Sequence, residues 1–163
     1  MMGGKDIYSN FGYYDAVHMQ TAGTAAINGT TIDLQQFNAC TFVIKLGSIA
    51  TGGIPAASYH NIMIQHGLAS AAGVSAWSDV VYGSQLLHSI VSTSHTLTSG
   101  VWQSITSYTD GSQVYILGYK KDSEHRYVRI KLSATGAPSV ISQVAAIAVC
   151  GFPANWPINE PLD

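Results

Sequence analysis

Histidines are the first residues to test for chemistry in this chain, because imidazole binds transition metals and transfers protons. His60 and His66 share one face of a predicted strand, but six extended residues separate them by about 20 Å. One ion therefore cannot join them, and we interpret both as strand-end histidines at the edge of the core. The remaining histidines are scattered single residues without a visible partner: His18, His88, His95 and His125. No zinc-binding motif is present, so we predict no metal site and no cofactor.

Nucleophilic and acid–base chemistry also lacks a signature. The chain has no GxSxG elbow, and its paired glycines are not followed by the GK[ST] of a phosphate loop. The acidic residues lie mostly at or near predicted turns, where a carboxylate can accept hydrogen bonds from backbone N–H groups. These are Asp33, Asp79, Asp110, Asp122 and Glu124. We therefore predict that the protein is not an enzyme and has no catalytic residue.

The composition excludes several classes of protein. The 163 residues suffice for one domain, and 47% are hydrophobic, which argues against disorder. Only 10% are charged, against roughly 25% in an average soluble domain. The net charge of −2 argues against a nucleic-acid binder. One basic cluster, which we interpret as a solvated strand face, contains Lys120, Lys121, Arg126, Arg129 and Lys131. A surface this poor in charge is easily desolvated against a partner, which favours an assembled protein.

No membrane or targeting segment is expected. The start of the chain, Met1–Asp6, has no apolar core, and the longest apolar stretch, Val140–Phe152, is too short to span a bilayer. Cys40 and Cys150 form no CxxC pair, so we expect free buried thiols in a reducing compartment. The sequence leaves open whether the two cysteines face each other on neighbouring strands.

Hydrophobic alternation predicts strands along most of the chain. The clearest case is 40–46, where every second residue is apolar. No window of twelve residues shows helical periodicity. Segments 69–76 and 92–100 are predicted loops, and Asn28-Gly29 is a turn signal. The predicted strands are 16–21, 31–34, 40–46, 59–68, 77–82, 101–106, 113–119, 126–132 and 140–149, with a short apolar run at 86–91. Short strands separated by turns predict an all-β fold, a β-sandwich or jelly roll.

Both ends of the chain are predicted to be extended arms around the sandwich domain of residues 15–150. Residues 1–14 are rich in aromatic rings, and residues 151–163 contain three prolines, which cannot donate to a strand ladder. Exposed aromatic rings favour docking, because such side chains dominate the energetics of protein interfaces. The candidate interface residues are Tyr8, Phe11, Tyr13, Tyr14, Phe152 and Trp156.

The C-terminal half carries a resemblance to a known group of proteins. An apolar strand ends at Gly118-Tyr119, a charged turn follows, and the next strand reads Arg126-Tyr127-Val128-Arg129-Ile130-Lys131-Leu132. A Thr135-Gly136 turn, an apolar strand and Gly151-Phe152-Pro153 come next, and Ile32–Phe37 precedes the strand 41–46. In these features residues 31–153 resemble the decoration, or cement, proteins of tailed-bacteriophage capsids. The resemblance implies a β-sandwich or jelly roll without catalytic residues.

The predicted function is a virion structural protein that stabilises the phage head by binding between major capsid subunits. Its other expected partners are copies of itself, because Val114–Tyr119 and Val144–Val149 are apolar on both faces and allow a dimer or trimer. It would be assembled in the cytoplasm of the bacterial host, without contacting membrane or nucleic acid directly. One alternative is a head–tail connector, neck or tail component. A second is a carbohydrate-binding module with a stacking platform of Trp77, Trp102 and Tyr108.

Overall fold

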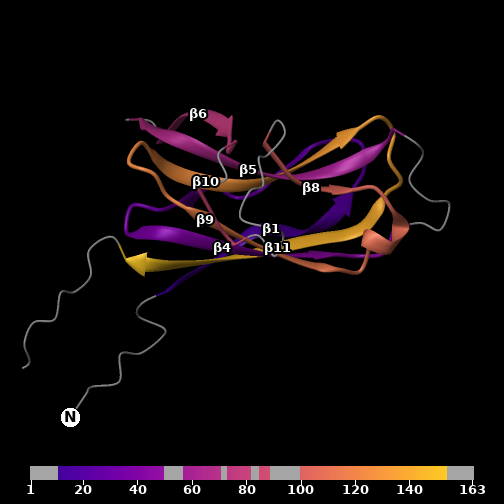
Figure 1. Cartoon of the computed structure of the whole chain (residues 1–163), viewed down its shortest axis with the longest axis horizontal. Helices are drawn as coiled ribbons and strands as arrows, with labels where there is room; N and C mark the ends of the chain where they lie inside the picture. Colours follow the sequence, from indigo (N-terminus) through magenta and orange to yellow (C-terminus); the bar gives the residue numbers. More distant parts are fainter. Residues whose placement is uncertain (1–10, 50–56, 71–72, 82–84, 89–99, 154–163) are drawn as a thin grey trace, which may run out of the picture.

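Two antiparallel β-sheets lie one above the other in the computed structural model, which describes residues 11–49, 57–70, 73–81, 85–88 and 100–153 (Figure 1). The first sheet, sheet A, has the strand order β1 (Gly12–Ala22), β11 (Ile141–Pro153), β4 (Phe37–Leu46), β9 (Val114–Lys120) and β7 (Leu86–His88). The second sheet, sheet B, has the order β2 (Ile27–Asn28), β10 (His125–Thr135), β5 (Tyr59–Ser70) and β6 (Gly73–Asp79). In addition, β3 (Ile32–Asp33) pairs with β10, and β8 (Val101–Ile105) pairs with β5. The predicted all-β sandwich is therefore confirmed.

The core lies between the sheets and follows the alternation of the sequence. In β4 the buried side chains are Cys40, Phe42, Ile44 and Leu46, as the period of two predicts. The facing strands of sheet B contribute apolar side chains that are at most 2% exposed: Ile62, Ile64, Val128, Ile130 and Leu132. Together these residues form one continuous hydrophobic cluster. No described helix is long and apolar enough to cross a bilayer; the described helical structure includes a short 3₁₀ helix at Tyr108–Asp110.

Three predicted boundaries were wrong. β1 begins at Gly12, and Gly12–Tyr14 pair with Cys150–Ala148, so these residues lie in the sheet and not in an arm. β11 likewise continues to Pro153, which pairs with Phe37. The predicted loop 69–76 is largely strand, because β5 reaches Ser70 and β6 begins at Gly73. In each place a neighbouring strand supplies backbone partners, and this tertiary pairing overrides the weak β-propensity of Gly, Ala and Pro.

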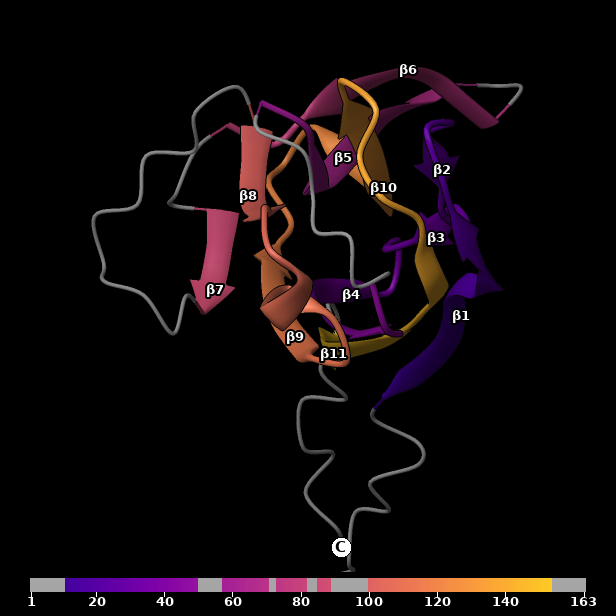
Figure 2. The same cartoon turned by 90° about the vertical axis from the view of Figure 1, so that its right-hand side faces the viewer.

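One side of the sandwich is closed by the segment that contains β2 and β3, which lies near β1 and β10 in Figure 2. Gly29 N donates to Ile130 O in sheet B, and Thr30 N donates to Ala16 O in sheet A, both at 2.8 Å. A Cβ atom on Gly29 would lie 2.4 Å from Ala16 O, so the close approach of the backbones requires glycine there. The Asn28-Gly29 signal thus marks the point where the two sheets are tied together.

The two cysteines face each other across β4 and β11. Cys40 and Cys150 are directly paired in register, and Cys150 Sγ donates a hydrogen bond to Cys40 Sγ at 3.2 Å. Both thiols are free and buried, as expected. The hydrogen bond from Cys150, together with burial, raises the pKa of the Cys40 thiol, which keeps it protonated and unreactive at neutral pH.

The contact between Asp33 and Arg126 anchors β3 and gives a pH-dependent prediction. Arg126 Nε and Gln35 N each donate to Asp33 Oδ1 at 2.8 Å. The hydrogen bond from Arg126 holds the pKa of Asp33 below its usual value of 3.8, although burial opposes this. Because the folded-state pKa is the lower one, the carboxylate stabilises the fold above about pH 3.8 and this contribution disappears as the pH falls through the folded-state pKa.

We predict that Asp33→Asn lowers the free energy of unfolding at pH 7. The difference in this free energy between the variant and the wild type should become smaller below pH 4. Urea unfolding at a series of pH values measures this. Asp15→Asn serves as the control, since Asp15 is an exposed carboxylate that lies 3.2 Å from Nδ1 of the exposed His18. If the free energies of unfolding of Asp33→Asn and the wild type differed by the same amount at all pH values, the charge of Asp33 would not have this role.

Candidate functional site

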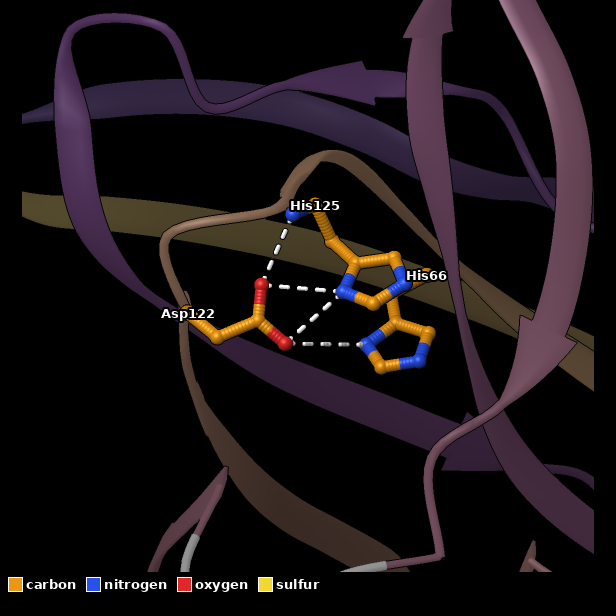
Figure 3. Close-up of side chains that lie close together, drawn as sticks. All are labelled: His66, Asp122 and His125. Atoms are coloured by element: carbon orange, nitrogen blue, oxygen red, sulfur yellow. Dashed lines mark hydrogen bonds and ion pairs between the residues drawn. The ribbon is translucent and has the colours of Figure 1, made fainter.

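Two imidazole rings and one carboxylate converge at one end of the sandwich, close to the crossing from sheet A to sheet B (Figure 3). His66 lies in β5, His125 is the first residue of β10, and Asp122 lies in the connection between β9 and β10. Each offers one ligand atom, and these atoms all lie within 4.8 Å of one another. We call these three residues the histidine–aspartate cluster.

Asp122 is held by its own loop. Its Oδ1 atom accepts hydrogen bonds from the backbone N–H groups of Glu124, at 3.0 Å, and His125, at 2.7 Å. Its Oδ2 atom lies 2.7 Å from Nδ1 of His125 and 3.9 Å from Nδ1 of His66. Burial raises the pKa of Asp122, but the hydrogen bonds from His125 and Glu124 together outweigh it and leave this pKa below its usual value. The carboxylate is therefore charged at neutral pH, with one oxygen aimed at both rings.

The two imidazole rings are stacked face to face. Their centroids lie 3.5 Å apart and their planes differ by 3°. Two positive rings would repel each other strongly at this distance. Burial lowers the pKa of His66, and the neighbouring His125 lowers it further. His66 therefore remains neutral, and Nδ1 of His125 is the ring atom that faces both carboxylate oxygens, at 2.9 and 2.7 Å.

Two further side chains complete the surroundings of the cluster. Tyr119, fully buried in sheet A, places its hydroxyl 3.2 Å from His66 Nδ1 in sheet B, and the two rings meet edge to face. Gln85, next to β7, donates from Nε2 to Asp122 Oδ2 at 2.6 Å. The other atom of the same amide, Oε1, is buried without a hydrogen-bond partner among the described residues. The site therefore joins β5, β7, β9 and β10.

Sequence reasoning missed this cluster because its members come together only through strand pairing. His125 was interpreted as a single residue without a partner, and this was wrong: Leu68 pairs with His125 in register, which brings His66 beneath its ring. A usable signal was present in the Asp122–His125 spacing of three residues in a turn. His60 lies at the far end of β5, where its Nε2 is 2.9 Å from Ser139 O, so His60 and His66 are separate as expected.

A second candidate site is the outward face of sheet A. Strand register places Ile147, Val43 and Ile116 in one row across β11, β4 and β9, and Tyr13 and Val149 start the next row. Ile147 is 54% exposed, Tyr13 57% and Ile116 41%. In the row on the other side of the first one, Lys45 of β4 pairs with Val114 of β9. The side chain of Val114 is also 54% exposed. We call Tyr13, Val43, Val114, Ile116, Ile147 and Val149 the outer apolar face.

Few charges interrupt this face. Asp15 pairs with Ile147 and Lys45 pairs with Val114, and these are the charged residues of the rows described above. The Lys45 ammonium group donates to Ser112 O at 2.6 Å, so it bends toward the turn before β9. Contiguous apolar surface of this kind marks sites of protein interaction in soluble proteins.

The predicted interface residues are distributed over several surfaces. Tyr13 belongs to the outer apolar face, whereas Tyr14, 37% exposed, is its neighbour in β1 and points to the opposite side of the strand. Phe11 covers the backbone of Gly151, where an added Cβ atom would lie 2.9 Å from the ring. The predicted residues Tyr8 and Trp156 and the side chain of Phe152 lie outside the described residues.

The proposed carbohydrate platform is not assembled by the described side chains. Trp77 lies under the Arg129 guanidinium, whose Cζ atom is 4.2 Å from the ring centroid, on the outer side of sheet B. Trp102 packs against the hydrophobic core and meets Tyr115 edge to face at 6.0 Å. The side chain of Tyr108 lies outside the described residues. A shared flat surface of Trp77 and Trp102 is therefore not formed.

Comparison with known proteins adds little to this geometry. No family model matches the chain, and no curated protein is similar to it in sequence. A solved structure to which it is similar is titled "Structure of infectious bursal disease virus Gt strain", with 9% identity and a TM-score of 0.25. That match covers 88% of this chain but 42% of the viral chain, so this chain spans less than half of it. A TM-score this low does not establish a shared fold, and the sandwich assignment rests on the strand pairing above.

The hydroxyl of Tyr119 gives a direct test of the inter-sheet contact in the cluster. We predict that Tyr119→Phe lowers the free energy of unfolding by about 1 kcal/mol, because a buried hydrogen bond between the sheets is lost while the ring stays in place. Urea unfolding should show a lower midpoint with an unchanged slope. The matched control is Tyr13→Phe, an exposed tyrosine that should unfold like the wild type. Equal behaviour of the two variants would show that the Tyr119 hydroxyl does not bind His66.

Proposed function

We propose that this protein is a virion structural protein that decorates the head of a tailed bacteriophage by binding between major capsid subunits. The observation that carries the proposal is the outer apolar face of sheet A. A β-sandwich with a full core has no structural need for Ile147, Val114 and Ile116 on its outer surface, where apolar side chains cost solubility. Their presence is explained when a partner protein covers them.

Low charge supports a permanent partner rather than a transient one. Interface cores are depleted in charged residues, and permanent interfaces are more apolar than transient ones. Two charges border the outer apolar face: Asp15 stands at the β1 end of the row of Ile147, Val43 and Ile116, and Lys45 pairs with Val114. A capsid subunit is a partner of this kind, because a decoration protein stays in place for the life of the particle.

The position of the two chain ends also supports an assembled role. Gly12 pairs with Cys150, so β1 starts beside the last residues of β11, at the same end of sheet A. Residues 1–10 and 154–163 therefore connect to the sandwich at neighbouring points next to Tyr13. In the proposal both segments contact adjacent subunits, which enlarges the buried area without enlarging the core. Many symmetric copies would strengthen binding further through avidity.

The outer apolar face can be tested by adding one charge to it. We predict that Ile147→Lys lowers the occupancy of this protein on phage particles at least tenfold, because an ammonium group would be buried at the interface. The fold should be kept, since the new lysine lies opposite Asp15 on β1. The measurement is rebinding of the purified chain to particles assembled without it, scored by quantitative mass spectrometry.

The control is Val140→Lys, which adds the same charge at a residue 48% exposed in the loop before β11, away from the face. Equal loading of the two variants would contradict the proposal. The copy number of the wild type separates decoration from the alternative of a neck or tail component. Decoration requires copies over the whole shell, whereas a neck component is limited to one small ring.

A further inference from the structure

We propose that the histidine–aspartate cluster binds one divalent transition-metal ion, of which Zn²⁺ is the representative. Its ligands are His66 Nδ1, His125 Nδ1 and Asp122 Oδ2. Two imidazole nitrogens with one carboxylate oxygen form a donor set that suits Zn²⁺ and its neighbours in the first transition row. This site lies at the sheet crossing and is independent of the outer apolar face.

The distances between the ligand atoms bracket the separation that an ion needs. Ligand atoms around a tetrahedral Zn²⁺ lie about 3.3 Å apart. In the cluster, Asp122 Oδ2 is 2.7 Å from His125 Nδ1 and 3.9 Å from His66 Nδ1. The rings are parallel, so each must tilt to turn its lone pair toward a common point in front of Asp122 Oδ2. The ion would bind the neutral imidazole of His125, with the ring proton on Nε2, and would take its place between Nδ1 and the carboxylate.

Hydrogen bonds around the ligands already fix the carboxylate in the required orientation. The backbone N–H groups of Glu124 and His125 hold Oδ1, so Oδ2 is the oxygen left facing the rings. Gln85 Nε2 donates to that oxygen at 2.6 Å, as expected for the support of a metal-bound carboxylate. The Tyr119 hydroxyl, 3.2 Å from His66 Nδ1, lies within reach of the remaining position.

A second, independent observation is the buried Oε1 atom of Gln85, which lacks a hydrogen-bond partner among the described residues. This atom belongs to the amide that contacts Asp122, so an uncompensated acceptor lies beside the cluster. Buried polar atoms without partners are rare and often mark a place where water or an ion belongs. In the proposal, a water molecule bound to the ion is the donor that Gln85 Oε1 lacks.

The ion would link the two sheets through its ligands. His66 belongs to the long strand β5 of sheet B, whereas Asp122 lies in the connection that leaves β9 of sheet A. Joining them fixes the crossing between the sheets, and binding to the folded state alone raises the melting temperature. At a hundredfold excess over Kd the rise should be about 5–10 °C for a domain of this size.

The experiment is a calorimetric and thermal titration of the metal-free full-length chain with ZnCl₂, with MgCl₂ as the hard-cation comparison. We expect one Zn²⁺ per chain, a higher melting temperature, and no response to Mg²⁺. Asp122→Asn and His125→Gln should each weaken Zn²⁺ binding at least tenfold. His18→Gln is the matched control, because His18 also lies three residues from an aspartate, Asp15, but on an exposed surface, and it should bind like the wild type.

A measurement on the wild-type protein does not depend on whether the variants fold. In the ¹⁵N NMR spectrum of the imidazole rings, Zn²⁺ should shift the nitrogens of His66 and His125 and leave those of His18 unchanged. Absence of stoichiometric Zn²⁺ binding would overturn the proposal and leave the cluster as a hydrogen-bonded brace. Shifts at other histidines, or binding that survives both ligand substitutions, would overturn it as well.

Discussion

The two-residue period of side chains in β4 and β11 is the constraint on which the structure depends. The strands pair in register from Val144–Leu46 to Pro153–Phe37, so each residue is assigned to the core or to the outside. Val144, Ala146, Ala148 and Cys150 fill the core, and this fixes Ala145, Ile147 and Val149 on the outer side. Because β11 is apolar on both faces, the sandwich cannot bury one set without presenting the other. The outer apolar face is thus a direct consequence of the strand that also completes the core.

The crossing from sheet A to sheet B carries the histidine–aspartate cluster. β9 ends in sheet A beside Tyr119, and β10 begins in sheet B at His125, so the connection must join both layers within a few residues. Asp122 accepts hydrogen bonds from two backbone N–H groups in this turn, and the rings of His66 and His125 stack on each other beside it. The polar cluster and the apolar face lie in different parts of the fold and carry separate roles in our account.

Much of the fold could be predicted from the sequence, because alternation is local information. The period in 40–46 and 126–132 identifies strands and their buried faces, and both were confirmed. The ends of the strands could not be predicted in the same way. Gly12–Tyr14 and Gly151–Pro153 are extended because each segment pairs with a neighbouring strand in the folded sheet. The histidine–aspartate cluster was missed for the same reason. His66 and His125 are 59 positions apart, and the register of β5 against β10 brings them together.

We propose that another protein covers the outer apolar face in the native particle. The most direct measurement is hydroxyl-radical footprinting of this chain, free in solution and within intact virions. We expect Tyr13, Ile116 and Ile147 to be oxidised in the free chain and protected in the particle, while Val140 is oxidised in both. Equal oxidation of the three face residues in the free and the assembled states would contradict it.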